Sequence, residues 1–358
     1  MTARNWKPDV LGKGYESTEL AAGRATGEKV NSGRPNGGAD SGNAGGGKEV
    51  ATLIRHLPEG RSKVPGQAVL FIHGWSDYFF NTELAEFFTD LGVAFYALDL
   101  HNHGRSLRTG SLGGFVGDLE DYDTELRTAL DAVVDDLRQH DGLEAPRVAL
   151  MGHSTGGLVA ALWTSRFPET VSHLILNSPW LEMHGSSFVR HGMYSMVEPM
   201  ARWWPHSKIK LPERDFYWRS ISSQAEGEWD LDDNLRPPLA FPMRWGWMSA
   251  ILAGQAQVAR GLKIPVPILV MMSARSLNGP RWREGMRSAD AVLDIQTMAA
   301  RAITLGESVT IEKVDGGLHD VLLSEKVVRE QAYARLQRWL LGYMLSDSPD
   351  KRSRTEAE

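Results

Sequence analysis

The 358-residue sequence predicts an α/β fold, with a mostly parallel, eight-stranded sheet and helices on both of its faces. Short runs of continuous apolar residues alternate with longer segments in which apolar residues recur at helical spacing. The apolar runs lack the alternation of a strand with one wet face, as expected for strands buried on both sides of a parallel sheet. Ligands bind such sheets at the carboxyl ends of the strands, so the residues that follow each run are the first candidates for a site.

The strands are expected at spacings that leave room for helices between them. After a strand region within residues 1–22, we expect strands at Glu49–Leu57, Gln67–Ile72, Val93–Leu98, Arg147–Met151, His173–Leu176, Pro267–Met272 and Val309–Val314. Helical spacing is clearest over Asp121–His140, where one face carries Leu126, Leu130, Val133, Val134 and Leu137.

Composition describes the remaining segments and excludes several classes of function. Residues 23–48 are rich in Gly, Ala, Ser and Asn and are predicted to be a flexible loop, and residues 346–358 a disordered tail. A net charge of −6 argues against nucleic-acid binding. The absence of cysteine excludes disulfides, thiol nucleophiles and Cys-ligated metals. Since no apolar run reaches the roughly 18 residues that span a bilayer, and residues 1–10 lack a signal peptide, we expect a cytoplasmic protein without an integral membrane segment.

The turn Gly152-His153-Ser154-Thr155-Gly156 lies between a predicted strand and an apolar helical segment. Such a Gly-x-Ser-x-Gly pattern is typical of a sharp turn that exposes a nucleophilic serine. The glycines remove Cβ atoms that would collide in the turn, and the helix N-terminus favours negative charge beside Ser154. The alternative is a Gly-rich turn with a capping serine. The strand before it and the helix after it favour a nucleophile.

A second turn, His73-Gly74-Trp75, closes the strand predicted at Gln67–Ile72. A tetrahedral oxyanion needs two preorganised N–H donors. We expect the backbone N–H groups of Thr155 and Trp75 to supply them, although this turn could also simply hold a structural histidine. The residues expected to support the site through the shape of the two turns are His73, Gly74, Gly152, His153 and Gly156.

With the stretch Asp99-Leu100-His101-Asn102-His103-Gly104-Arg105-Ser106, the two turns resemble the α/β-hydrolase superfamily. The similarity is to its monoacylglycerol lipase and lysophospholipase-like branch, the serine aminopeptidase-type hydrolases. That branch has Asp-x-x-Gly-His-Gly-x-Ser, and Asn102 replaces the first glycine. The resemblance spans roughly residues 49–343 and is poor between about 183 and 264. It implies a hydrolase core at 49–182 and 263–345, a helical cap at 183–262, and ester hydrolysis by a serine triad without metal or cofactor.

The superfamily orders its triad as serine, acid, histidine, so the base and the acid are sought late in the chain. His319 follows the last predicted strand and is the only histidine after residue 206. The acid is expected after the strand before it, where Asp290 aligns with the family pattern Asp-x-Val-Val/Leu. The connection to Asp290 is longer than usual, which leaves Asp294 as a rival. Asp315 and Asp320 are too close in sequence to His319 to reach its far ring nitrogen easily.

Other polar residues of the hydrolase-like stretch are expected to be structural. Asp99 is predicted to brace the loop near the active site. His101 and His103 could chelate a metal, but packing of the loop is the favoured interpretation. We therefore expect no metal site.

The predicted cap is rich in aromatic residues and methionine. Residues 183–248 hold six of the twelve Trp and six of the thirteen Met. Such residues suit an adaptable apolar pocket, or else they form a small core of the cap itself. The resulting hypothesis is a serine hydrolase that cleaves a small hydrophobic, lipid-like ester, such as a monoacylglycerol or lysophospholipid, with transient membrane-surface contact through the cap. The alternatives are an aminopeptidase or amidase of the same fold and a non-catalytic ligand-binding protein.

Overall fold

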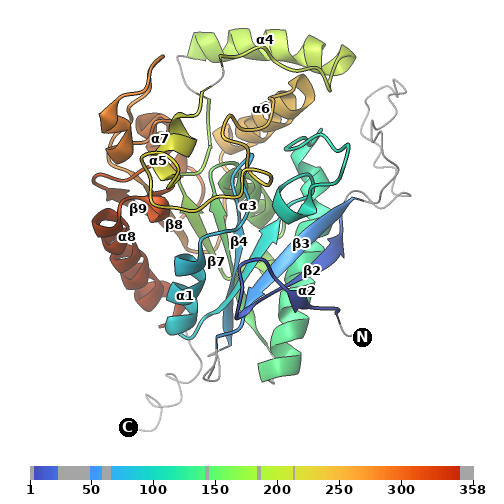
Figure 1. Cartoon of the computed structure of the whole chain (residues 1–358), viewed down its shortest axis with the longest axis vertical. Helices are drawn as coiled ribbons and strands as arrows, with labels where there is room; N and C mark the ends of the chain where they lie inside the picture. The colour runs from blue at the N-terminus through green and yellow to red at the C-terminus, as the bar shows by residue number, and fades with distance from the viewer. Residues whose placement is uncertain are drawn as a thin grey trace.

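The computed structural model of the chain describes residues 4–22, 49–58, 66–141, 145–183, 187–212 and 214–346. Its strands are β1 (Lys7–Pro8), β2 (Tyr15–Ala21), β3 (Val50–His56), β4 (Gln67–Ile72), β5 (Ala94–Asp99), β6 (Arg147–His153), β7 (His173–Asn177), β8 (Ile268–Ser273) and β9 (Val309–Val314). They form one sheet in the order β1-β2-β3-β5-β4-β6-β7-β8-β9 (Figure 1). The strands from β5 to β9 in this order are parallel, while β1, β2 and β3 pair antiparallel. The predicted mostly parallel α/β fold is confirmed.

Helices connect most of these strands. They are α1 (Thr82–Asp90), α2 (Asp123–Asp141), α3 (Thr155–Arg166), α4 (Ser187–Trp203), α5 (Phe216–Ile221), α6 (Trp245–Ala259), α7 (Ile295–Ala302) and α8 (Lys326–Trp339). Short 3-10 turns lie at Gly104–Ser106, Leu119–Tyr122, Pro168–Thr170, Glu284–Ser288 and Val321–Leu323, and a π-helical turn at Leu340–Met344 extends α8.

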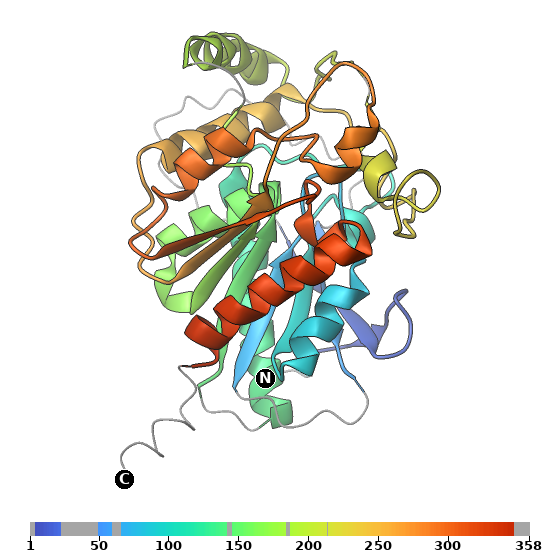
Figure 2. The same ribbon diagram turned by 90° about the vertical axis from the view of Figure 1, so that its left-hand side faces the viewer.

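Apolar side chains pack on both faces of the sheet because successive residues of a strand point to opposite faces. In β4, Ala68, Leu70 and Ile72 join one core, to which α2, α3, α6 and α7 contribute. Val69 and Phe71 of the same strand join a second core with α1 and α8. Figures 1 and 2 show the two helical layers on opposite sides of the sheet. Burial on both faces explains why the strands are continuous apolar runs in the sequence.

The strand order brings together the carboxyl ends of β4 and β6, where Ile72 pairs with Gly152. The chain leaves β4 toward β5 on one side and leaves β6 toward β7 on the other side. Open α/β sheets bind ligands at the point where such connections diverge. The two turns singled out in the sequence follow these two strands.

The sheet has nine strands among the described residues, rather than the eight predicted. Residues 1–22 hold two strands, of which β1 is two residues long and pairs with β2 at Lys7↔Ser17 and Pro8↔Glu16. So short an edge strand has no apolar pattern that sequence reasoning could detect. The Gly-rich loop predicted at 23–48 and residues 347–358 of the predicted tail lie outside the described residues.

The segment between β7 and β8, called the insertion below (residues 178–267), contains α4, α5 and α6. The predicted cap lies within it. α4 is the outermost helix in Figure 1, with α6 beneath it. Buried Trp247 and Ile251 of α6 join the first core, while Ile221 and Trp229 pack with Leu318, which follows β9. The buried apolar residues of the insertion are therefore shared with the rest of the molecule. No helix in the described ranges has the length and apolar character to cross a bilayer.

Candidate active site

Ser154 lies in a strained turn between β6 and α3. Its φ of 53° and ψ of −116° lie outside the regions that L-residues ordinarily adopt. A Cβ atom at Gly152 would lie 2.5 Å from the Gly156 carbonyl oxygen, and one at Gly156 would lie 2.6 Å from the Ile72 carbonyl oxygen. Both positions therefore require glycine. Backbone strain of this kind is often found where a functional side chain must be held in one place.

Two hydrogen bonds join Ser154, His319 and Asp290. Ser154 Oγ lies 3.0 Å from His319 Nε2, and His319 Nδ1 lies 2.9 Å from Asp290 Oδ2. Because an ionised carboxylate only accepts, Nδ1 carries the imidazole hydrogen and Nε2 accepts from the serine hydroxyl. His319 is 3% exposed and Asp290 is fully buried, so water competes little for these bonds.

The loop after β8 fixes the carboxylate of Asp290. Its Oδ1 accepts the backbone N–H groups two and three residues later, at 2.8 and 2.7 Å, which leaves Oδ2 for His319. Asp294, the rival acid, instead caps α7, where its Oδ1 accepts the Thr297 N–H at 2.8 Å. The histidine therefore contacts Asp290 and not Asp294.

The loop after β4 lies against the serine turn. A Cβ at Gly74 would lie 3.3 Å from Ser154 Cβ. His73 braces this loop, because its Nε2 accepts the Leu100 N–H at 3.1 Å and its Nδ1 donates to the Gly74 carbonyl at 2.7 Å. Thr155 is the first residue of α3, so its N–H has no partner inside the helix. The amides of Trp75 and Thr155 thus belong to two adjoining turns beside the hydroxyl.

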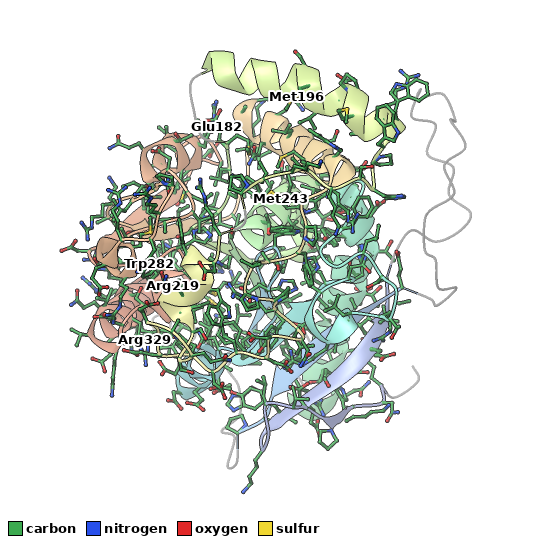
Figure 3. All side chains as sticks on the ribbon, turned by 45° about the horizontal axis from the view of Figure 1, so that its top comes forward. Glu182, Met196, Arg219, Met243, Trp282 and Arg329 are labelled. Atoms are coloured by element: carbon green, nitrogen blue, oxygen red, sulfur yellow. The ribbon has the colours of Figure 1, made fainter. Side chains whose placement is uncertain are left out.

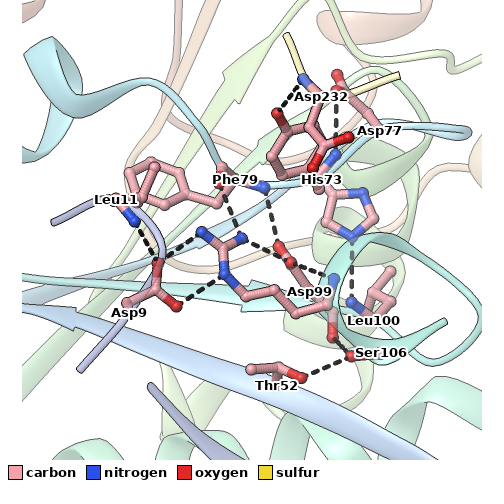
Figure 4. A network of polar contacts seen from close by, with 12 residues as sticks. Asp9, Leu11, Thr52, His73, Asp77, Phe79, Asp99, Leu100, Ser106 and Asp232 are labelled. Carbon is pink, nitrogen blue, oxygen red and sulfur yellow. Dashed lines mark hydrogen bonds and ion pairs between the residues drawn. The ribbon is translucent and has the colours of Figure 1, made fainter. Parts of the chain in front are cut away.

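Asp99 at the end of β5 supports the same loop (Figure 4). Its Oδ1 accepts the Phe79 N–H at 2.8 Å, and its Oδ2 accepts the Arg105 backbone N–H at 3.0 Å and Nη1 at 2.8 Å. Arg105 also binds Asp9 through Nε and Nη2, both at 2.8 Å. A Cβ at Gly104 would lie 2.5 Å from Asp99 Oδ2, so glycine is needed there. These contacts give Asp99 a structural role and join the N-terminal strands to the loop.

The polar residues after Asp99 are packed within the loop. Asn102, at the position of a family glycine, has φ = 60° and donates to the Phe115 carbonyl at 3.1 Å, and asparagine tolerates this region well. His101 Nδ1 lies 2.6 Å from Glu125 Oε1. Burial disfavours the cation, but the Glu125 carboxylate outweighs it and raises the pKa of His101. Burial also places the pKa of His103 well below its usual range. In the described ranges, no three His, Asp or Glu side chains gather as a metal site.

Sequence reasoning missed a polar cluster beside His319. The Tyr217 ring of α5 stands edge-on to the imidazole, with ring centroids 5.3 Å apart, and its hydroxyl lies 3.5 Å from His153 Nε2. His153 Nδ1 lies 3.1 Å from the Asn177 carbonyl and 3.7 Å from Asp320 Oδ2. Burial lowers the pKa of His153 and raises that of Tyr217, which favours neutral rings. Tyr217 lies in the part of the chain where the family resemblance was poor, so no motif marked it.

Three indoles form an apolar wall next to the serine turn. The rings of Trp75 and Trp247 have centroids 4.5 Å apart, and those of Trp247 and Trp180 are 5.9 Å apart. The backbone N–H of Trp180 donates to the Ser154 carbonyl at 3.0 Å, which places this residue beside the serine turn. Trp247 belongs to α6, so the insertion helps to build the wall.

Known proteins share parts of this sequence and its fold. Residues 63–277, more than half of the chain, match the family model of serine aminopeptidase, S33. A monoacylglycerol lipase from Mycolicibacterium smegmatis is 31% identical over 121 residues, which are 34% of this chain and 40% of that protein. A 1-acylglycerol-3-phosphate O-acyltransferase from Sus scrofa is 36% identical over 86 residues, which are 24% of this chain and 22% of that protein. The chain thus spans less than half the length of these relatives.

The fold is also similar to that of solved structures. A soluble variant of monoglyceride lipase from Saccharomyces cerevisiae, in complex with a substrate analog, superposes with a TM-score of 0.55. It covers 81% of this chain and 92% of that chain at 13% identity. At 13% identity this similarity shows a shared fold and nothing about activity.

Proposed function

Because the chain belongs to the serine aminopeptidase S33 family and has the α/β-hydrolase fold, we propose that it is a serine hydrolase of carboxylic esters. Ser154 Oγ attacks the ester carbonyl carbon while His319 Nε2 takes its proton, and Asp290 stabilises the imidazolium. The Trp75 and Thr155 amides donate to the oxyanion. His319 returns the proton to the leaving alkoxide, then activates the water that hydrolyses the acyl-enzyme.

The strongest support for this mechanism is the pair of distances around His319, 3.0 Å to Ser154 Oγ and 2.9 Å to Asp290 Oδ2. Nucleophilic catalysis requires a hydroxyl within reach of a base that a third group orients. The strained φ of Ser154 adds to this support, because it holds the hydroxyl toward the imidazole. The chemistry needs only the ester and water, so we propose no metal or cofactor.

We propose a lipid-like ester as the substrate class, such as a monoacylglycerol or lysophospholipid. The wall of Trp75, Trp180 and Trp247 suits an acyl chain, since pockets for such ligands are mostly apolar with a few polar groups. The sequence similarity to a monoacylglycerol lipase supports the same class.

The outer surface of the insertion supports transient contact with a lipid surface. The exposed apolar residues on and just after α4 include Met196 at 55%, Trp203 at 69%, Trp204 at 57% and Leu211 at 52%. Figure 3 labels Met196 on α4, at the outer edge of the molecule. Indoles favour the membrane–water interface. Trp203→Ala/Trp204→Ala should therefore sediment less with phosphatidylcholine vesicles than the wild type, and unchanged sedimentation would contradict the contact.

A fluorophosphonate probe tests the nucleophile. We expect the wild type to be labelled and Ser154→Ala not, while Ser165→Ala, a serine at the far end of the same helix α3, should be labelled normally. A series of p-nitrophenyl esters of increasing chain length would then measure the acyl preference, and matched p-nitroanilides would reveal an amidase. A folded wild type that resists the probe would favour the non-catalytic, ligand-binding alternative.

A further inference from the structure

The loop that carries Trp75 is fastened to the insertion. Residues 76–78 follow Trp75 directly, and each of them binds the segment 232–241. The hydrogen bonds run from Phe241 N to Ser76 Oγ at 2.9 Å, from Arg236 Nε to Asp77 Oδ1 at 3.0 Å and from Asp232 N to Tyr78 Oη at 3.0 Å. Figure 4 labels Asp77 and Asp232 in the same part of this polar network. Three consecutive residues of the loop thus depend on a segment far away in the sequence.

The ion pair of Arg236 and Asp77 is the central contact of the three. Both residues are only 5% exposed. Asp77 Oδ1 also accepts the Tyr78 N–H at 3.0 Å, so the carboxylate connects the guanidinium to the loop backbone. Arg236 Cζ lies 5.1 Å from the ring centre of Tyr217, whose ring is T-shaped to that of His319. Arg236 therefore binds the loop of Trp75 on one side and the surroundings of His319 on the other.

The loop has a conformation that needs such support. Ser76 is 2% exposed and has φ = 56°, a left-handed conformation that is unfavourable for a residue with a Cβ atom. On the other side of Trp75, His73 is held by the Leu100 N–H of the body. The Trp75 indole N–H also donates to the Gly114 carbonyl at 3.0 Å, so the body holds Trp75 and the residue pair before it, while the insertion holds the three residues that follow.

We propose that Arg236 is a positioning residue whose pair with Asp77 holds the Trp75 N–H where the oxyanion develops. This inference rests on the proposed function and adds to it that the insertion completes the oxyanion hole. A donor lowers the barrier only when it is aimed at the developing charge. When the segment 232–241 leaves the loop, an ester can still bind, but its transition state loses a donor. Docking of the insertion is therefore a condition for turnover.

Arg236→Met tests this role by its effects on kcat and KM. We expect kcat for p-nitrophenyl butyrate to fall about 10- to 100-fold, somewhat less than the loss when an oxyanion donor is removed outright. KM should stay within about threefold, because ground-state contacts remain. The Ki of an alkylboronic acid, whose adduct with the serine is tetrahedral and anionic, should rise by the same factor as kcat falls.

Arg329→Met is the matched control. Arg329 also anchors the insertion, since it pairs with Glu83 of α1 and with Glu228, and lies 5.2 Å over the ring of Trp229. Among the described residues, Arg329 forms hydrogen bonds with Glu83, Glu228 and the Ser324 carbonyl, and none with residues 76–78. We expect this variant to lose thermal stability while kcat stays within about twofold of the wild type.

The double variant Asp77→Asn/Arg236→Met separates positioning from stability. It removes both buried charges, so Tm should recover toward the wild-type value, whereas kcat should stay low. Arg236→Lys keeps the positive charge but lacks the planar guanidinium group, so its kcat should lie between those of Arg236→Met and the wild type. The inference is overturned by normal kcat in Arg236→Met, by recovery of kcat together with Tm, or by an equal loss in Arg329→Met. A wild type without turnover or probe labelling would instead refute the proposed function on which the inference rests.

Discussion

Asp290→Asn should prevent His319 from acting as a base, although asparagine has the same shape as aspartate and can keep its hydrogen bonds to the backbone. Asp290 Oδ1 accepts two backbone N–H groups at 2.8 and 2.7 Å, so the asparagine must keep its carbonyl oxygen there. Its NH₂ group then replaces Oδ2, 2.9 Å from His319 Nδ1. Because an amide nitrogen only donates, Nδ1 must accept and the imidazole hydrogen moves to Nε2. Nε2 can then no longer take the proton of Ser154.

The expected loss of kcat for Asp290→Asn is about 10⁴-fold, the size that a wrong histidine tautomer causes in another serine triad. That loss corresponds to about 5 kcal/mol of transition-state stabilisation. The free energy of unfolding should fall by only about 1–3 kcal/mol, since one hydrogen bond of a charged group is weakened and the backbone bonds remain. Hydrolysis of p-nitrophenyl butyrate and urea denaturation measure the two quantities.

Asp294→Asn is the control, because asparagine can keep the cap on α7 and Asp294 does not contact the histidine. Its kcat should stay within about twofold of the wild type. A loss below about tenfold in Asp290→Asn, combined with a large loss in Asp294→Asn, would refute the reasoning and move the acid to Asp294.

Three further substitutions test the support of the site and the fold. Gly104→Ala should cost about 3 kcal/mol in urea denaturation, because φ is +46° there and a Cβ would collide; a cost below about 1 kcal/mol would contradict this. Glu125 raises the pKa of His101 above 6.5, so the protonated ring stabilises the fold below that pH and the contribution is lost as pH rises through the raised value. The stability advantage of wild type over His101→Gln should therefore be larger at pH 6 than at pH 9, and the opposite trend would refute the assignment. Arg55→Met removes the guanidinium that pairs with the buried Asp136 and should cost about 3–5 kcal/mol by chemical denaturation, with a smaller cost when Asp136→Asn is added.

The sequence alone was sufficient for the mostly parallel sheet, apart from the two-residue edge strand β1, and for the two turns at its carboxyl edge. A parallel strand that is buried on both faces consists of consecutive apolar residues. The run Gln67–Ile72 therefore predicted both ends of β4 correctly. The sharp turn around Ser154 needs glycine two residues away on each side, so it too leaves a local pattern. The family match confirms the resemblance that these motifs carried. The catalytic roles of Ser154, Asp290 and His319 remain predictions.

Only the tertiary structure decided which distant groups meet. Asp290 and Asp294 are four residues apart and chemically identical, and what separates them is that one faces His319 while the other caps a helix. The ion pair of Arg236 and Asp77 could not be predicted from the residues that neighbour either one in the sequence. Periodicity and turn chemistry act between neighbours along the chain, whereas these contacts arise from how the insertion packs on the sheet. That packing is set by the sum of many apolar contacts, which no short stretch of sequence encodes.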